Sequence, residues 1–231
     1  MPRLAVAALV CAAALPGLAV RGTSLQGAPA QAQSEDTPDA LARALDARYK
    51  TIRDFSADFV QVYRGGALRT QAREQGTVRI KKPGLMRWLY EKPEKKEFVS
   101  DGHTIYSYFP ADRQVMVGRV PTDLEATTPA LFLAGKADIA RDFVASFAPS
   151  PVEGTTGLKL TPRRPEANVD YFIVATSRPR LQILGLAARD AQGGDSTLLF
   201  LNLKENQGIS DKEFAFRIPK GVDVVTNGSG N

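Results

Sequence analysis

The fold is decided by residues 76–110, which read GTVRIKKPGLMRWLYEKPEKKEFVSDGHTIYSYFP. Apolar and polar side chains alternate along this stretch, and turn signals interrupt it at Lys82-Pro83-Gly84, Lys92-Pro93 and Asp101-Gly102. Alternation with a period of two is typical of half-buried β-strands, and turns of this kind connect antiparallel neighbours. No helical segment separates the strands, so the stretch predicts an antiparallel β-meander.

The same pattern continues on both sides of the meander. Upstream, Thr37-Pro38 signals the start of a helix that runs to about Lys50, and Phe55 and Phe59 then alternate with polar residues before a Gly65-Gly66 turn. Downstream, a second helix opens at 128–129, and residues 138–147 read either as a short helix or as an irregular strand. Further strands are predicted at 114–119, 158–162, 171–176, 181–189, 196–204 and 213–218. The fold class is therefore α+β and mostly β.

Composition and motifs exclude several functional classes. The chain of 231 residues has one cysteine and one histidine, too few for a disulfide or for a zinc site built from those ligands. Lys and Arg number 30 against 25 acidic residues, a mild excess without a dense basic run, so no nucleic-acid partner is expected. Neither a phosphate-binding glycine loop nor a serine-nucleophile elbow is present. We therefore expect no metal and no cofactor.

The N-terminus resembles a secretory signal. Arg3 precedes an apolar stretch at residues 4–20, and Ala30-Gln31-Ala32 places small residues where a signal peptidase reads them. The sequence predicts a cleaved signal peptide over residues 1–32 and a single domain over residues 33–231. A membrane anchor is the alternative, although the apolar stretch contains Pro16 and is short for a span of about 20 residues.

The sequence contains no evident catalytic arrangement. The only histidine, His103, adjoins the Asp101-Gly102 turn, where an exposed turn residue is expected. Asp54 and Asp58 fall on the polar phase of their strand, so we expect both carboxylates to be solvated. A secreted hydrolase that uses an acidic pair stays open as an alternative, but no such pair stands in the apolar setting that would separate two pKa values.

Large apolar side chains on alternating strand positions are the remaining feature. They could form an ordinary core, but the strands outnumber the helices available to cover them, and an apolar helix at 127–135 stands isolated among strands. A short helix over a concave sheet would enclose an apolar slot suited to lipid tails or other apolar groups. The predicted slot residues are Phe55, Phe59, Val78, Ile80, Trp88, Tyr90, Phe98, Tyr106, Tyr108, Leu131 and Phe132.

Five blocks of this sequence resemble the periplasmic outer-membrane lipoprotein carriers of the LolA family. They are the F-x-A-x-F-x-Q block at 55–61, the block 76–88, the V-S-D-G-x-T block at 99–104 with the following Y-x-P and Q-V, the T-P pair at 128–129, and F-x-F-x-x-P-x-G-V at 214–222. The resemblance implies an unclosed antiparallel β-barrel of about eleven strands, covered by a lid of short helices.

The resemblance also implies a function without catalysis. The expected protein is a monomeric periplasmic carrier that accepts acylated lipoproteins from an inner-membrane ABC-type transporter and passes them to an outer-membrane receptor. A carrier of the same fold for another lipid, such as a glycolipid, is the alternative.

Two residues depart from the usual pattern of the family. Lys82 stands where the family usually has an arginine that tethers the lid helices, so the resemblance makes Lys82 the lid latch, with a plain solvated lysine as the alternative. Lysine offers a point charge instead of a planar fork of donors, so the empty protein is expected to open more readily than an arginine-bearing relative. Met86 stands at a position, usually Phe, that in the family lies at the mouth and contacts the transporter.

Overall fold

The computed structural model describes residues 37–65, 71–120, 129–164, 169–189 and 193–226. All of them fall within one compact unit, Ser34–Asn231. The predicted signal peptide at residues 1–32 lies outside the described residues, as do Gly66 of the first predicted turn and Thr128 before the second helix.

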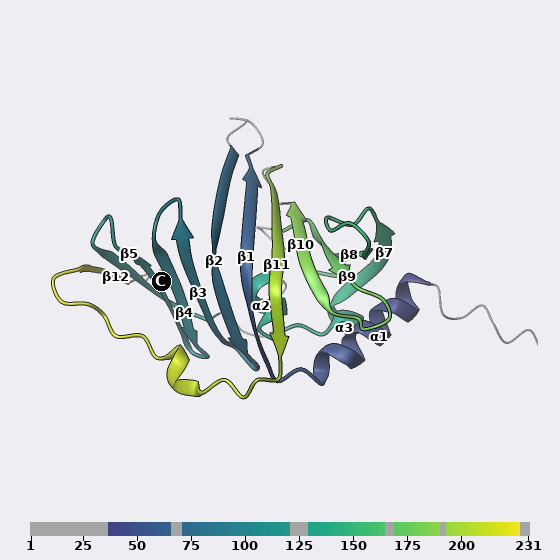
Figure 1. Cartoon of the computed structure of the whole chain (residues 1–231), viewed down its shortest axis with the longest axis horizontal. Coiled ribbons are helices and arrows are strands. Elements are labelled where there is room, and N and C mark those ends of the chain that lie inside the picture. The colour runs from purple at the N-terminus through teal and green to yellow at the C-terminus, as the bar shows by residue number, and fades with distance from the viewer. Residues whose placement is uncertain (1–36, 66–70, 121–128, 165–168, 190–192, 227–231) are drawn as a thin grey trace, which may run out of the picture. The chain divides into compact units, whose positions relative to one another are not determined.

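Twelve strands of the described residues form one sheet, in the order β12-β6-β5-β4-β3-β2-β1-β11-β10-β9-β8-β7 (Figure 1). All neighbouring pairs are antiparallel except β12 and β6, which are parallel. The strands β12 and β7 are the two edges, so the prediction of an unclosed, mainly antiparallel sheet is confirmed, with one strand more than expected. The bounds are β1 Asp54–Arg64, β2 Gln71–Lys81, β3 Leu85–Lys92, β4 Lys96–Asp101, β5 Thr104–Phe109, β6 Gln114–Arg119, β7 Phe143–Ala148, β8 Thr156–Pro162, β9 Tyr171–Thr176, β10 Ile183–Arg189, β11 Asp195–Glu205 and β12 Asp223–Thr226.

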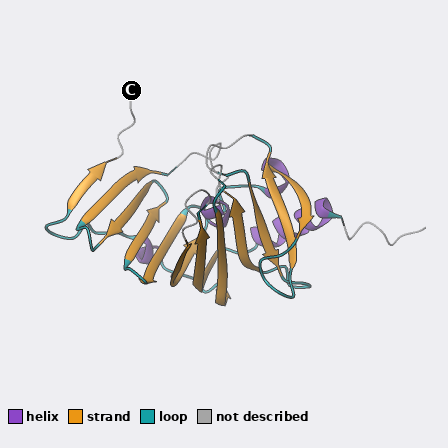
Figure 2. Cartoon of the chain, turned by 90° about the horizontal axis from the view of Figure 1, so that it is seen from above, coloured by secondary structure: helices purple, strands orange, loops and turns teal. Residues whose placement is uncertain are grey.

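Short helices accompany the sheet: α1 is Pro38–Lys50, α2 is Pro129–Leu133, α3 is Ile139–Asp142, and the 3₁₀ helix η2 is Asp211–Phe214. The predicted start of α1 is confirmed, because the Thr37 hydroxyl accepts the Ala40 N–H and Pro38 occupies the first turn. Seen from above, the sheet is curved and α2 lies on its concave side (Figure 2). In the part of the chain that is described, no helix has the length and apolar character needed to cross a membrane.

The predicted strand at 213–218 is wrong. The residues of η2 form a 3₁₀ turn there, and irregular chain follows it. Ser210 caps the turn by accepting the Lys212 N–H, and such local side-chain bonds compete with extended structure. Strand β12 was not predicted, because its four residues are all exposed and carry no alternation. The range 138–147 contains both of the alternatives in succession, α3 and then β7.

The core lies between the helices and one face of the sheet. Phe132 of α2 stacks on Tyr49 of α1 with ring centroids 5.5 Å apart and also meets Phe172 of β9 at 5.3 Å. Phe143 at the start of β7 meets the same Phe172 ring at 5.2 Å. Aromatic packing of this kind fixes α2 against both α1 and the second half of the sheet.

The expectation that Asp54 is solvated is wrong. Its side chain is only 3% exposed, and its carboxylate accepts the backbone N–H groups of Gln207 and Gly208 at 2.7 and 3.1 Å. The carboxylate is buried because the chain leaving β11 folds over the start of β1, and a buried carboxylate needs such donors. Asp58 is half-buried and accepts a hydrogen bond from Asn202 at 2.6 Å. His103 is exposed in its turn, as predicted.

Candidate functional site

A cavity of about 410 Å³ lies between α2 and the sheet. Its volume falls within the range of about 300–1,000 Å³ that is typical of ligand pockets. Among the described residues, none of those that line the cavity is charged, so the cavity suits an uncharged and mainly apolar ligand. The lining residues are Gln61, Met86, Trp88, Tyr90, Phe98, Ile105, Pro129, Ala130, Leu133, Leu186, Ala188, Ser196 and Leu198.

The cavity has the size of a single acyl chain. A dry cavity of about 150 Å³ takes up benzene, which corresponds to about 25 Å³ per carbon atom. On this measure the space of about 410 Å³ holds about 16 carbons. The concave face is therefore not filled by its own side chains.

The β1–β3 side of the cavity depends on a glycine. Phe59 of β1 meets Trp88 and Tyr90 of β3 edge to face, with ring centroids 5.2 and 4.8 Å apart. These rings reach across β2 at Gly76, which pairs with Phe59 on one side and with Tyr90 on the other. A Cβ at Gly76 would overlap the Leu89 carbonyl. Gly76 therefore keeps the strands close enough for the aromatic wall to form.

The structure brings only part of the predicted slot together. Trp88, Tyr90 and Phe98 line the cavity. The other predicted residues on this side of the sheet and on α2 are buried in the core behind the cavity: Phe55, Phe59, Val78, Ile80, Leu131 and Phe132.

The assignment of Tyr106 and Tyr108 to the slot is wrong. Phe98 pairs with Ser107, and successive side chains of a strand point to opposite faces, so the two tyrosines lie on the outer face. There they contact Phe216, with ring centroids 5.1 and 6.1 Å away. Ile105 takes the place in the cavity that the sequence analysis assigned to the tyrosines.

Met86 is buried against the cavity. Its side chain is 7% exposed and lines the cavity beside Trp88. The reason is again strand parity, because Met86, Trp88 and Tyr90 occupy the same face of β3.

The lining residues that β10, β11 and α2 contribute were not predicted from the sequence. Leu186 and Ala188 of β10 and Leu198 of β11 occupy alternating strand positions, and this periodicity was available as a signal. Gln61 belongs to the F-x-A-x-F-x-Q block, but the slot residues were chosen for their large apolar side chains, and a glutamine does not meet that condition.

Lys82 joins the end of α1 to the turn after β2. Its Nζ donates to the Tyr49 carbonyl and lies 3.7 Å from the centroid of the Tyr49 ring. The Tyr49 hydroxyl in turn donates to the Leu133 carbonyl of α2 at 2.7 Å. The methylene groups of Lys82 pack on Gly135, where any Cβ would overlap them and where φ is +73°. Lys82 thus reaches α2 by packing and through Tyr49.

Burial controls the ionisation of Lys82. Desolvation lowers the pKa of the Lys82 ammonium from 10.5 to about 8, with Arg48 acting in the same direction and Asp46 and Glu205 opposing it. The pKa of the neighbouring Tyr49 hydroxyl is raised, mainly by burial and also by Glu205, so this hydroxyl stays a donor.

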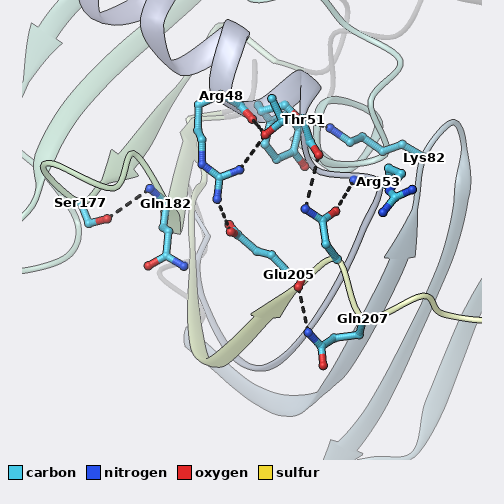
Figure 3. Close-up of polar contacts among 10 residues, drawn as sticks. Arg48, Thr51, Arg53, Lys82, Ser177, Gln182, Glu205 and Gln207 are labelled. Atoms are coloured by element: carbon cyan, nitrogen blue, oxygen red, sulfur yellow. Dashed lines mark hydrogen bonds and ion pairs between the residues drawn. The ribbon is translucent and has the colours of Figure 1, made fainter.

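The end of α1 is held to β11 by polar contacts (Figure 3). Arg48 pairs with Glu205 and donates to the Thr51 hydroxyl at 3.0 Å. The Asn206 side chain accepts the Arg53 N–H at 2.7 Å and donates to the Thr51 carbonyl at 3.4 Å. These contacts make the end of α1 a fixed support for the α2 contacts that Tyr49 and Lys82 provide.

Comparison with known proteins decides the family. The family described as outer membrane lipoprotein carrier protein LolA matches residues 50–217. This chain belongs to the LolA family. One LolA-family relative, an outer-membrane lipoprotein carrier protein of Chromohalobacter salexigens, is 33% identical over 214 residues, covering 91% of this chain and 96% of its own. Another, from Hahella chejuensis, is 30% identical over 79% of this chain and 86% of its own.

One solved structure shares the fold of this LolA-family chain. An uncharacterized conserved protein from Thermus thermophilus matches it with a TM-score of 0.50 and 12% identity, covering 80% of this chain and 99% of its own. At that identity the likeness concerns the fold alone.

Proposed function

We propose that this protein is a periplasmic carrier of acylated lipoproteins that works without catalysing a reaction. In this proposal it accepts its cargo from an inner-membrane ABC-type transporter and delivers it to an outer-membrane receptor. The observation that carries the proposal is an uncharged, acyl-sized cavity beneath α2 in a member of the LolA family. The relatives named above are described as outer-membrane lipoprotein carrier proteins, which supports the same cargo.

The physical task is to move acyl chains through water. Each exposed CH₂ group costs about 0.8 kcal/mol, so a chain of about 16 carbons costs about 13 kcal/mol when it is fully exposed. A cavity that recovers most of this free energy would hold the cargo too firmly for release. If α2 closes over the empty cavity, the apparent association constant equals the intrinsic constant multiplied by the fraction of molecules that are open, so closure weakens binding.

Lys82 is the proposed latch of this closure. Its ammonium group donates to the Tyr49 carbonyl of α1, its methylene groups pack on Gly135 after α2, and the residue is half-buried. We expect Lys82→Arg to hold α2 more firmly, because arginine presents five donors in a flat fork. Binding of a neutral apolar dye to the empty protein should then decrease, and unchanged dye binding would contradict the latch role.

A release assay tests the carrier function. The mature protein is added to spheroplasts, and the supernatant is examined for soluble lipoprotein bound to it. We expect lipoprotein to appear only when the carrier is present, and its absence from the supernatant would refute the proposal. Mass spectrometry of the purified protein separates the cargo classes, since a co-purified glycolipid in place of acylated lipoprotein would favour a carrier of another lipid.

A further inference from the structure

Three polar side chains interrupt the otherwise apolar lining of the cavity. The Tyr90 hydroxyl of β3 donates to Gln61 Oε1 of β1 at 2.8 Å, and Gln61 Nε2 donates to Ser196 Oγ of β11 at 3.2 Å. All three residues line the cavity. We call these three residues the polar cluster.

The polar cluster has hydrogen-bond donors left over. Gln61 uses one of its two amide N–H bonds for Ser196, and Ser196 accepts that bond and so keeps its own O–H. Within the described parts of the chain, neither group makes another hydrogen bond. The pKa of Tyr90 is raised by burial and by Glu74, so its hydroxyl stays protonated and keeps the Gln61 oxygen occupied. What remains is a pair of donors, which suits a neutral acceptor.

The polar cluster lies at one end of the cavity. Tyr90 and Met86 both line it and are four residues apart on β3, which separates them by about 13 Å. The Tyr90 end adjoins charge, because Lys96 Nζ lies 4.4 Å from the Tyr90 ring centroid and pairs with Glu74 at 2.5 Å. The Met86 end is apolar, and the end of α2 lies near it, since the N–H of Gly84 just before β3 donates to the Ala134 carbonyl just after α2. A ligand with a polar head and an apolar tail therefore has one favoured direction.

We propose that the polar cluster is a carbonyl-binding subsite, in which Gln61 and Ser196 donate to the ester or amide carbonyl that joins an acyl chain to its head group. The alkyl tail then runs toward Met86 and Leu133. The inference rests on the proposed carrier function and adds the part of the cargo that is recognised. It also predicts selectivity, because an ionised fatty acid would bring a charge into a cavity whose described lining holds no cation, and the adjoining Lys96 is already paired with Glu74.

Competition binding tests the subsite. A neutral apolar fluorophore is displaced from the protein by methyl hexadecanoate, N-methylhexadecanamide, heptadecane or hexadecanoate, all supplied from the same nonionic micelles. We expect the ester and the amide to compete better than the alkane, and the carboxylate to compete least at pH 8. If only one of the two carbonyl compounds exceeds the alkane, that linkage is the one recognised.

Two variants isolate the donors. Ser196→Ala and Gln61→Met should each reduce the ratio of ester to alkane affinity by about fivefold, the effect of one hydrogen bond. Thr197→Ala is the matched control, since Thr197 is the neighbour of Ser196 on the opposite face of β11 and should leave the ratio unchanged. The infrared band of a ¹³C-labelled ester carbonyl gives a direct readout, at lower wavenumber in the wild type and at higher wavenumber in both variants.

The outcomes separate the two proposals. Equal ratios and an unshifted carbonyl band in all proteins would refute the subsite and leave the carrier function standing. Failure of every ligand to displace the fluorophore would refute the acyl-binding cavity, and the subsite with it.

Discussion

The hydroxyl of Tyr49 provides the sharpest test of how α2 is held closed. Tyr49→Phe removes only the donor to the Leu133 carbonyl at 2.7 Å. The ring remains, so its stacking on Phe132 at 5.5 Å and its contact with Lys82 Nζ at 3.7 Å are retained. Leu133 is 1% exposed, so its carbonyl has no ready access to water after the change.

An orphaned buried carbonyl sets the size of the effect. Leaving such a group unsatisfied costs about 1–3 kcal/mol. If the cost falls on the closed position of α2, the equilibrium for opening α2 increases by about 5- to 150-fold. Dye binding to the empty protein should increase in the same direction, because a larger fraction of molecules is open.

Hydrogen exchange followed by mass spectrometry measures this opening. The amides of Ala134, Gly135 and Lys136 bond to carbonyls of α2 at 2.9–3.0 Å and report on it directly. We expect faster exchange at 129–136 and unchanged exchange in β9, Tyr171–Thr176. The control is Tyr106→Phe, which removes a tyrosine hydroxyl from the outer face.

Two results would refute the reasoning. Unchanged exchange at 129–136 would mean that the Tyr49 hydroxyl does not hold α2. An equal increase in β9 would mean that the substitution destabilises the whole fold instead of opening α2.

Three further predictions concern other parts of the molecule. The pKa of Lys82 is lowered to about 8, so between about pH 8 and 10.5 the unfolded chain binds more protons than the folded chain. Across that window the free energy of unfolding of the wild type should rise by about 1–2 kcal/mol relative to that of Lys82→Met. A constant difference between the two proteins in urea titrations would contradict this. Asp54→Asn should lower the free energy of unfolding by about 1.5–3 kcal/mol in the same assay, because its NH₂ group would face one of the two backbone N–H donors that the carboxylate now accepts. An unchanged value would mean that the carboxylate is dispensable. Ala188→Trp should fill the cavity and weaken dye binding at least about tenfold, while Ala187→Trp on the opposite face should not; equal binding by both would place the ligand elsewhere.

Much of the strand pattern could be read from the chain. The strands β6 and β9 have the predicted bounds, and the helix capped by Thr37 begins where its signals stand. These features are local, since alternation, caps and turns depend on residues only a few positions apart. Two elements were not predicted. The capped turn η2 has the mainly charged sequence DKEF, and β12 pairs along its backbone while its side chains are exposed.

The cavity could be anticipated only as a kind of site. An apolar sheet with a covering helix was readable from the composition of the strands, but the choice of lining residues depended on which face each strand presents. In β5, for example, Ile105 lines the cavity, whereas its neighbour Tyr106 points to the outer face and contacts Phe216. Pairing between strands sets that parity, and it cannot be read from one strand alone.

The sequence by itself determined that this chain builds a long antiparallel sheet with an apolar face and a short apolar helix. The tertiary structure alone decided where the polar groups meet: Gln61 finds Ser196 across 135 positions of sequence, and Asp54 finds Gln207 across 153. Such contacts depend on the register between distant strands and on the curvature of the sheet. Neither the register nor the curvature produces a repeating pattern in the local sequence, because a hydrogen bond depends on distance in space and not on separation in sequence.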